Sequence, residues 1–424
     1  MDQRATLTTM AATLTATLLL LAMAMAMTGC QTPVEEPAYA QPLPEGAFAL
    51  RRLDEADRPD LGSAADQLAD PGLREALDRS IAWYAKPSAR QHFPLGPITH
   101  GQAQASAYAL RQIADLPRDE ALAALDSDFD VWQSVGWDGA GTVFYTGYYA
   151  PVFEASRQPT GRYRYPLYTR PDDLASDPVT GEVRGRRTAE GYAPYATRAE
   201  LERSGALRGR ELVYLPSRLH AYMIEVNGSA RLNMTDGSTL YIGYAGNNGH
   251  DYTSIGKLLV EDGYIDEHRL TLSAIEQHFE RYPQQLEDYI RRNDRFVFFK
   301  AYDAATWPAG SLGVRVEAMR TLATDKSIFP RGAPVLVETR MAGSPATGGR
   351  SMPRQQLMVD QDTGGAIRAA GRADIFYGIG DRPGALAGEQ AAEGRLYYLL
   401  LRRDRVQAWH DRLQGDGRRA DARR

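Results

Sequence analysis

Residues 356–381 read QLMVDQDTGGAIRAAGRADIFYGIGD, and carboxylates, glycines and apolar strand-forming residues are packed more closely here than elsewhere in the chain. An apolar run leads to Asp360 and Asp362 and then to a Thr-Gly-Gly turn, where glycine permits positive φ and close approach of a ligand. A second apolar run carries Asp374, followed by the apolar residues 375–377. An apolar environment raises the pKa of a carboxyl group, as a general acid requires. We therefore predict the active site in this stretch.

The same residues also have a purely structural interpretation. An aspartate before a glycine turn often accepts hydrogen bonds from backbone N–H groups. This role is favoured for Asp362, which stands directly in the turn. For Asp374 the local sequence leaves structural and catalytic roles equally open.

Motifs spread over residues 143–400 resemble those of the lytic murein transglycosylase A family. In chain order they are Tyr145-Thr-Gly-Tyr-Tyr, Gly243-Tyr-Ala-Gly-Asn-Asn-Gly-His-Asp-Tyr-Thr-Ser-Ile-Gly, Phe296-Val-Phe-Phe, Thr324-Asp-Lys-Ser-Ile, Pro330-Arg-Gly-Ala-Pro, Asp362-Thr-Gly-Gly-Ala-Ile-Arg, Arg372-Ala-Asp-Ile-Phe-Tyr-Gly and Gly394-Arg-Leu. They follow the family's order, so their combination is specific.

The resemblance implies a mainly β fold with N-terminal and connecting helices. It further implies a double-psi β-barrel domain with an inserted smaller β domain and a groove between them. We assign a helical lead-in and the barrel to 61–153 and 291–405, and the inserted domain to 154–290.

The resemblance also implies an activity. Family members cleave the β-1,4 bond between N-acetylmuramic acid and N-acetylglucosamine in peptidoglycan without water and leave 1,6-anhydromuramoyl ends. By motif match Asp374 is the single acid and then base. Its pKa has to be raised by burial or by a neighbouring carboxylate, and Asp362 and Asp360 are the candidate neighbours. Positions implied for substrate binding are Tyr148, Asn248, Tyr252, Thr324, Asp325, Gly364 and Arg372.

Some positions depart from the family pattern. Ala150 stands where Glu or Thr is common, and Asn227 and Ala230 interrupt a Gln-Gly-Ser-Gly motif. These departures keep a non-catalytic peptidoglycan-binding lipoprotein open as an alternative, and a hydrolytic muramidase on the same fold is another. No phosphate-binding loop, cysteine cluster or paired-histidine motif is present, so we predict neither cofactor nor metal.

The N-terminus has the pattern of an export signal. An apolar, alanine-rich run from Met10 to Met27 ends in Gly29-Cys30, which resembles a lipobox. Cys30 is the only cysteine, which excludes an intramolecular disulfide. We predict a signal peptide over 1–30, lipidation of Cys30, and anchoring to the periplasmic face of the outer membrane, with Gln31 favouring that membrane.

Composition restricts the partners. A net charge of −5 and the lack of a long basic block before the C-terminal tail argue against nucleic acid. The predicted partners are peptidoglycan glycan strands and, through the anchor, a membrane. Residues 31–60 are rich in Pro, Glu and Ala and predict a tether, and the basic tail at 406–424 is expected to end in disorder.

Hydrophobic periodicity supplies the remaining elements. Helices are expected at 70–86, 102–115, 117–134 and 197–207, with two more over 255–292. Strands are expected at 141–153, 296–302, 313–317, 322–325, 335–339, 357–359 and 396–401. The glycine at 147 in the first of these predicts a bulge or a close approach. Short strands alternate with turns over 154–240, where Asn227-Gly228 predicts a hairpin turn. The amides, tyrosines and glycines of 241–256 suit sugar binding, although a loop whose Asn side chains only bond backbone fits equally.

Overall fold

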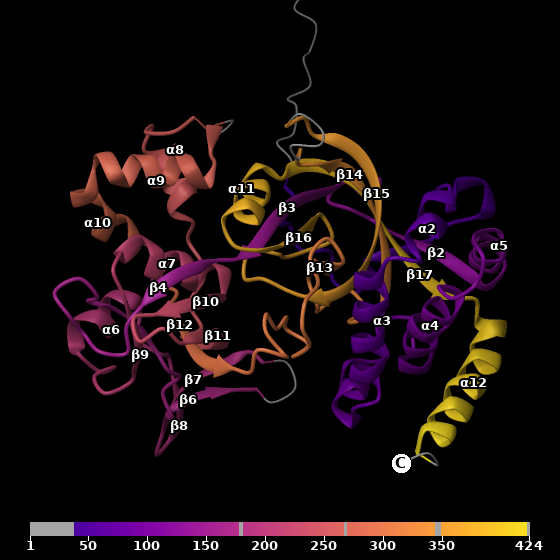
Figure 1. Ribbon diagram of the computed structural model, residues 1–424, viewed down its shortest axis with the longest axis horizontal. Helices are drawn as coiled ribbons and strands as arrows, with labels where there is room; N and C mark the ends of the chain where they lie inside the picture. Colours follow the sequence, from indigo (N-terminus) through magenta and orange to yellow (C-terminus); the bar gives the residue numbers. More distant parts are fainter. Residues whose placement is uncertain (1–37, 178–180, 267–268, 344–348, 422–424) are drawn as a thin grey trace, which may run out of the picture. The chain divides into compact units, whose positions relative to one another are not determined.

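The computed structural model describes residues 38–177, 181–266, 269–343 and 349–421, and its main element is an eight-stranded sheet (Figure 1). The strands follow the order β1-β2-β17-β14-β15-β13-β16-β3. Their bounds, in that order, are Leu50–Arg52, Phe129–Ser134, Ala391–Leu401, Pro334–Met341, Met352–Asp362, Thr321–Ala323, Arg372–Ile379 and Val143–Ala150. Two neighbouring pairs are parallel, β13 with β15 and β16 with β3. Strand β3 also pairs with the start of β17.

The centre of this sheet is covered on both faces. Leu357, Met358 and Val359 of β15 are fully buried, which explains why the sequence runs as continuous apolar residues instead of alternating. Leu357 and Val359 belong to the same apolar cluster as Leu73 and Leu77 of α3. Each such buried side chain contributes roughly 1.5–3 kcal/mol to folding. The eight-stranded sheet and the helices beside it therefore share one core.

Helices α2 (Gly62–Gln67), α3 (Pro71–Tyr84), α4 (His100–Ile113) and α5 (Arg118–Asp128) precede most of the large sheet in sequence, and α3 and α4 pack on β15 and β17 (Figure 1). The start of α3 has a clear cause. Asp70 accepts a hydrogen bond of 2.9 Å from the Leu73 backbone N–H, and Pro71 occupies the first helical position. Arg320 forms a 3.0 Å ion pair with the same carboxylate, which ties the helix start to the strand region.

The middle of the chain forms smaller sheets. A four-stranded sheet has the order β12-β11-β10-β4, with bounds Val297–Tyr302, Thr239–Asn247, Ser229–Met234 and Val152–Ala155. Two further sheets contain β5 (Tyr165–Tyr168) with β9 (Glu211–Leu215), and β6 (Leu174–Ser176) with β7 (Val183–Thr188) and β8 (Gly191–Ala193). The helices of this region are α6 (Arg198–Ser204), α7 (Arg218–Asn227), α8 (Ile255–Glu261), α9 (Leu272–Arg281) and α10 (Leu286–Arg291).

The last two helices follow strands of the large sheet. Helix α11 (Asp381–Glu389) packs on β3 and β16, and α12 (Arg403–Asp421) packs on α4 (Figure 1). Contacts group the chain from Tyr39 onward into one compact unit. The proposed division at 154–290 is therefore a subdivision within a single contact unit.

The mainly β character with helices agrees with the prediction, but several elements differ. The helix expected at 117–134 ends at Asp128, and residues 129–134 form β2, so Trp132 lies on a strand. Phe129 and Val131 are fully buried, and pairing with β17 outweighs the helical spacing. The tether predicted to residue 60 is wrong at its end, because β1 pairs with β2 and Leu50 is buried.

Other corrections concern the second half of the chain. Helix α7 was not predicted, and Gly228 is its left-handed C-cap, with φ 74°, instead of part of a hairpin turn. Residues 313–317 form no strand, and the strand expected at 296–302 joins the four-stranded sheet through β11. The basic tail is helical as far as Asp421, because Trp409 packs against Tyr108 and donates to Asp128.

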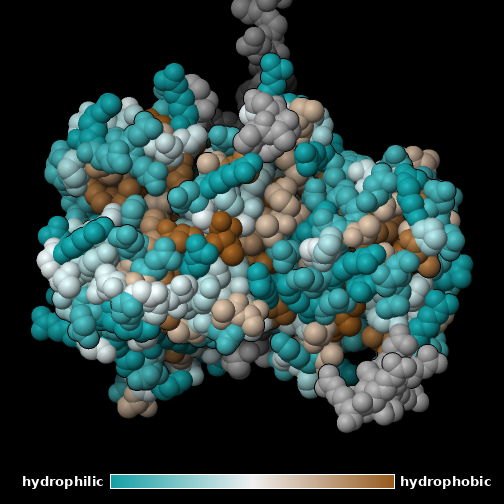
Figure 2. Space-filling model, in the orientation of Figure 1, coloured by the Kyte–Doolittle hydropathy of each residue, from teal (hydrophilic) through white to brown (hydrophobic). Residues whose placement is uncertain are grey.

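Hydrophilic side chains cover much of the face seen in Figure 2, with apolar ones in smaller areas. Within the described ranges, no helix has both the length and the apolar character needed to span a bilayer. The predicted signal peptide and Cys30 lie outside the described residues.

Candidate active site

Asp374 lies on β16, paired with Thr146 of the parallel strand β3. The Thr146 hydroxyl donates a hydrogen bond of 2.9 Å to Oδ1 of Asp374. Arg372 donates to the same hydroxyl oxygen at 3.3 Å, and its guanidinium lies over the Phe144 ring. Two adjacent strands therefore position the carboxyl, its hydrogen-bond donor and a nearby cation.

Burial raises the pKa of the Asp374 carboxyl from 3.8 to about 6. Desolvation is the largest cause, and the negative charge of Asp362 adds to it, while the positive charge of Arg372 and the Thr146 hydrogen bond lower the pKa. The direction agrees with the prediction from the apolar neighbours. A carboxyl with this pKa keeps its proton in about one molecule in ten at pH 7, roughly a hundredfold more than an ordinary aspartate, so it can serve as a proton donor.

Asp362 ends β15 and is held by three donors. The Tyr148 hydroxyl donates to Oδ2, and the backbone N–H groups of Ser311 and Thr363 donate to Oδ1, each at 2.8 Å. Burial raises the pKa of the Asp362 carboxyl, while these hydrogen bonds oppose that rise. The turn role predicted for Asp362 thus coexists with a position next to Asp374.

Asp360 has a different environment from the one predicted. Its side chain is fully buried and accepts hydrogen bonds from Lys326, from the Thr324 hydroxyl at 2.8 Å and from the Tyr398 hydroxyl at 2.7 Å. It is absent from the causes that shift the pKa of Asp374. Because a buried lysine neutralises its charge, Asp360 is a structural ion-pair partner instead of the expected neighbour of the acid.

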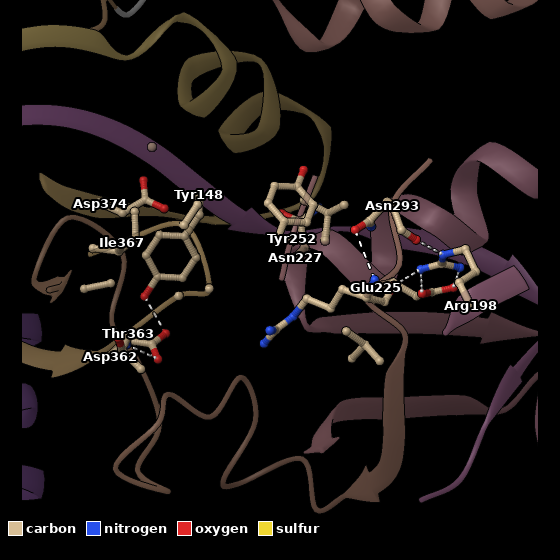
Figure 3. Close-up of a pocket in the computed structure, with 18 residues that line it drawn as sticks. Tyr148, Arg198, Glu225, Asn227, Tyr252, Asn293, Asp362, Thr363, Ile367 and Asp374 are labelled. Carbon is tan, nitrogen blue, oxygen red and sulfur yellow. Dashed lines mark hydrogen bonds and ion pairs between the residues drawn. The ribbon is translucent and has the colours of Figure 1, made fainter. Parts of the chain in front are cut away.

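Asp374 and Asp362 line a cavity of about 240 Å³ (Figure 3). One side is built by β3, β16 and the loop after β15, with Tyr148, Asp362, Thr363, Ile367 and Asp374 close together in the view. The other side is built by α6, α7, the loop before α8 and the segment before β12, with Arg198, Glu225, Asn227, Tyr252 and Asn293. The cavity therefore joins the large sheet to the middle region of the chain.

Gly147 lines the same cavity and is required by close packing. A Cβ atom there would lie 2.8 Å from the Tyr377 ring and from the Cα atom of Ala387. Of the two meanings predicted for this glycine, a bulge or a close approach, the structure shows the close approach.

The comparisons with known proteins agree with this geometry. The chain is 33% identical over 277 residues to membrane-bound lytic murein transglycosylase A of Vibrio cholerae, covering 64% of this chain and 69% of that protein. Over 273 residues it is also 33% identical to the Escherichia coli K12 protein of the same name, with the same coverage. The chain belongs to the lytic murein transglycosylase A family.

Family models and solved structures support the same assignment, under MltA, the short name of the family. A model described as the MltA specific insert domain matches residues 144–300, and one described as the 3D domain matches 320–400. A membrane-bound lytic murein transglycosylase from Agrobacterium tumefaciens has a TM-score of 0.69 at 26% identity, covering 85% of this chain and all of that one. E. coli MltA with bound chitohexaose gives 0.61 at 25% identity, covering 86% and 96%. The predicted family membership is confirmed.

The residues implied by the MltA motifs fall into two groups. Tyr148, Tyr252 and Gly364 line the cavity together with Asp362 and Asp374. Neither Gly364 nor Gly365 has positive φ, so the turn does not use that freedom of glycine.

The second group lies outside the cavity lining. Asn248 is 2% exposed and bonds three backbone groups, those of Ala196, Asp294 and Phe296. Thr324 donates to the Asp360 carboxylate, and Arg372 donates to the Thr146 hydroxyl, which in turn donates to Asp374. Asp325 accepts hydrogen bonds from the backbone N–H groups of Ser327 at 3.0 Å and Ala369 at 2.9 Å. These side chains organise the backbone around the cavity.

Several residues at this site of the MltA member were not predicted from sequence. Arg198, Glu225, Asn293 and Arg295 line the cavity and contribute a buried ion pair and a cationic wall, and Thr146, outside the lining, donates a hydrogen bond to Asp374. The ion pair joins residues on two helices, and no local motif marks it. Thr146 stands inside the quoted Tyr-Thr-Gly-Tyr-Tyr motif, which was the available signal, whereas its pairing with Asp374 is seen only in the fold.

Across the four described ranges, no group of three or more His, Cys, Asp or Glu side chains is placed to hold a metal ion.

Proposed function

We propose that this lytic transglycosylase cleaves the β-1,4 bond between N-acetylmuramic acid and N-acetylglucosamine in peptidoglycan, with Asp374 as acid and then base. The observation that carries the proposal is a partly buried carboxyl of raised pKa on the wall of a cavity. Family membership supports the reaction class.

The first step transfers one proton. Protonated Asp374 donates it to the glycosidic oxygen, the C1–O bond breaks, and positive charge develops at C1 of the muramoyl residue. The resulting Asp374 carboxylate and the nearby Asp362 carboxyl group stabilise this positive charge at C1. Thr146 keeps Oδ1 of Asp374 in place through its hydrogen bond.

The second step returns the proton. The muramoyl 6-hydroxyl attacks C1 and loses its proton to the Asp374 carboxylate, which closes the 1,6-anhydro ring and restores the acid. No water is consumed. Ordinary glycosidases need a second carboxylate as nucleophile or base for water. One carboxyl suffices here because the nucleophile belongs to the substrate.

Product analysis tests this mechanism. Sacculi digested with the chain should release muropeptides with anhydro ends, each lighter by one water than the reducing-end product of a hydrolytic muramidase. Asp374→Asn should fold and release neither product. A reducing-end product would assign the chain to the hydrolases, and unchanged sacculi would favour the non-catalytic binding protein.

The strand pairings support the double-psi β-barrel. Six strands follow one another as β17, β14, β15, β13, β16 and β3, and β3 pairs back with β17. We place the inserted domain between β3 and β13 in chain order, with its end moved to about residue 302 because β12 belongs to the smaller sheet.

Lipidation of Cys30 and attachment to the periplasmic face of the outer membrane complete the proposal. It is supported by the lipobox-like Gly29-Cys30 and by relatives that are named as membrane-bound. Labelled palmitate should enter the wild-type chain, and Cys30→Ala should prevent labelling and release the protein from the membrane fraction. Labelling of that variant would place the lipid elsewhere.

A further inference from the structure

A short segment before β12 is held by buried polar side chains. Arg198 donates to the carbonyl oxygens of Asn293 at 3.0 Å and Arg295 at 2.6 Å. Asn248 donates to the intervening carbonyl of Asp294 at 2.8 Å. Three successive carbonyl groups therefore have fixed partners, and the backbone that carries Arg295 has little freedom.

We call the contacts of Arg198 and Asn248 with these three carbonyl groups the Arg198 clamp, and further contacts hold the clamp in place. Arg198 forms an ion pair with Glu225, and their side chains are 1% and 5% exposed. The Oδ1 atom of Asn293 accepts a hydrogen bond from the backbone N–H of Arg295 at 3.3 Å. Buried ion pairs give little net stability but fix geometry when every group has a partner. This network fixes the direction in which the Arg295 side chain leaves the backbone.

Arg295 enters the same cavity as Asp374. Its Nη1 atom donates to the His250 carbonyl at 3.2 Å, and its guanidinium lies against Gly365, where an added Cβ would be 3.5 Å from Cζ. Among the described residues Arg295 forms no ion pair within 4.0 Å, and the negative charge of Asp251 acts on it only electrostatically. A cation is thus held at the cavity wall without a direct ion-pair partner.

Peptidoglycan supplies an anion that the sugar rings themselves lack. The pyranose rings and N-acetyl groups are neutral, whereas the 3-O-lactyl group of muramic acid ends in a carboxyl. That carboxyl is free on peptide-free glycan. When a stem peptide is attached, it becomes a neutral amide and the carboxylates are those of the peptide. A guanidinium binds a carboxylate through two parallel N–H groups, which gives strength and orientation.

We propose that Arg295 is a substrate-binding residue that recognises a carboxylate on the lactyl substituent of a muramoyl residue, either the free lactyl carboxylate or one on the stem peptide. The inference rests on the proposed function, because it takes the glycan as the cavity's occupant. It assigns the cavity a preference for muramoyl glycan over uncharged chitin-type oligosaccharides.

Binding measurements on the full chain carrying Asp374→Asn test the proposal without cleavage. The probes are neutral chitohexaose, peptide-free glycan oligosaccharides and glycan oligosaccharides with stem peptides. Arg295→Gln should weaken binding of at least one acidic probe about tenfold to a hundredfold, the range expected for charge-assisted hydrogen bonds, and leave chitohexaose unchanged. Arg295→Lys should recover part of the loss.

Arg368→Gln is the matched control. Arg368 is exposed, follows the same glycine turn and influences Arg295 electrostatically, but it does not line the cavity. Its replacement should change each dissociation constant less than about threefold, since an exposed charge acts weakly.

The outcomes distinguish the two possible sources of the carboxylate, and they distinguish a failure of this proposal from a failure of the proposed function. Loss on the peptide-free probe assigns the lactyl carboxylate, and loss only on the peptide-bearing probe assigns the stem peptide. Equal loss on chitohexaose, equal loss from Arg368→Gln, or no loss from Arg295→Gln would overturn the proposal. Failure of the wild-type chain to release anhydro products would count against the proposed function instead, because that result comes from digestion and not from binding.

Discussion

Replacing Asp374 by Asn should stabilise the fold at neutral pH while it abolishes bond cleavage. The pKa of Asp374 is about 6 in the folded protein against 3.8 ordinarily. Between these values the folded state binds more protons at this site than the unfolded state. The folding stability that the protonated carboxyl contributes is therefore fully present below pH 3.8, and it is lost as the pH rises from 3.8 through about 6.

The magnitude follows from the two pKa values. A difference of about 2 pKa units corresponds to about 3 kcal/mol, which is fully expressed only above the folded pKa. Asn has nearly the same volume and can still accept the hydrogen bond from Thr146. We expect Asp374→Asn to exceed the wild type by up to about 3 kcal/mol in free energy of unfolding near pH 8, and to match it near pH 3.5.

Urea unfolding followed by circular dichroism at a series of pH values measures this difference. Asp411→Asn is a suitable control, because Asp411 is an exposed aspartate on α12, and it should show no comparable pH dependence. The same wild-type preparation should lose kcat/KM on soluble glycan above about pH 6, because the acid must be protonated to act.

Two results would refute this reasoning. A stability difference between Asp374→Asn and wild type that stays constant from pH 4 to pH 8, roughly the window set by the two pKa values, would mean that burial does not shift this carboxyl. Cleavage by Asp374→Asn at more than about a tenth of the wild-type rate would move the acid to another residue.

Three further substitutions test the surroundings of the acid. Tyr148→Phe removes a donor to Asp362 and should raise the pKa of that carboxyl further, as read by NMR titration; an unchanged pKa would contradict the 2.8 Å hydrogen bond. Lys326→Met leaves the buried Asp360 carboxylate without its cation and should lower the free energy of unfolding by about 3–5 kcal/mol in urea titrations, with a loss below about 1 kcal/mol arguing against the pair. Gly147→Ala places a methyl group in occupied space and should lower the melting temperature, corresponding to about 1–3 kcal/mol, whereas an unchanged melting curve would show that the strand can shift.

The sequence was most informative where local pattern and chemistry coincide. Asp374 stands between strand-forming residues, and both the strand and the direction of its pKa shift follow from those neighbours. Gly147 likewise marked a close approach inside an aromatic strand. Such features depend on residues adjacent in the chain, so they can be read without knowing the fold.

Features set by distant residues could not be predicted in this way. Asp360 and Asp362 stand two positions apart in one strand, yet Lys326 neutralises one and Tyr148 orients the other. The apolar residues of 129–134 are spaced as in a helix, but the segment forms a strand because β17 pairs with it. The Arg198 clamp depends on partners from separate helices and loops, which no motif spacing encodes.

The hydrogen bond between Thr146 and Asp374 spans 228 positions of sequence. Synthesis of the first two-thirds of the polypeptide therefore delivers a strand that still lacks Asp374, the proposed acid. Contacts of such long range form slowly and late in folding. An enzyme that cuts the cell wall thus acquires its cutting geometry only after nearly the whole chain has emerged, and a prematurely terminated product would be harmless to the wall.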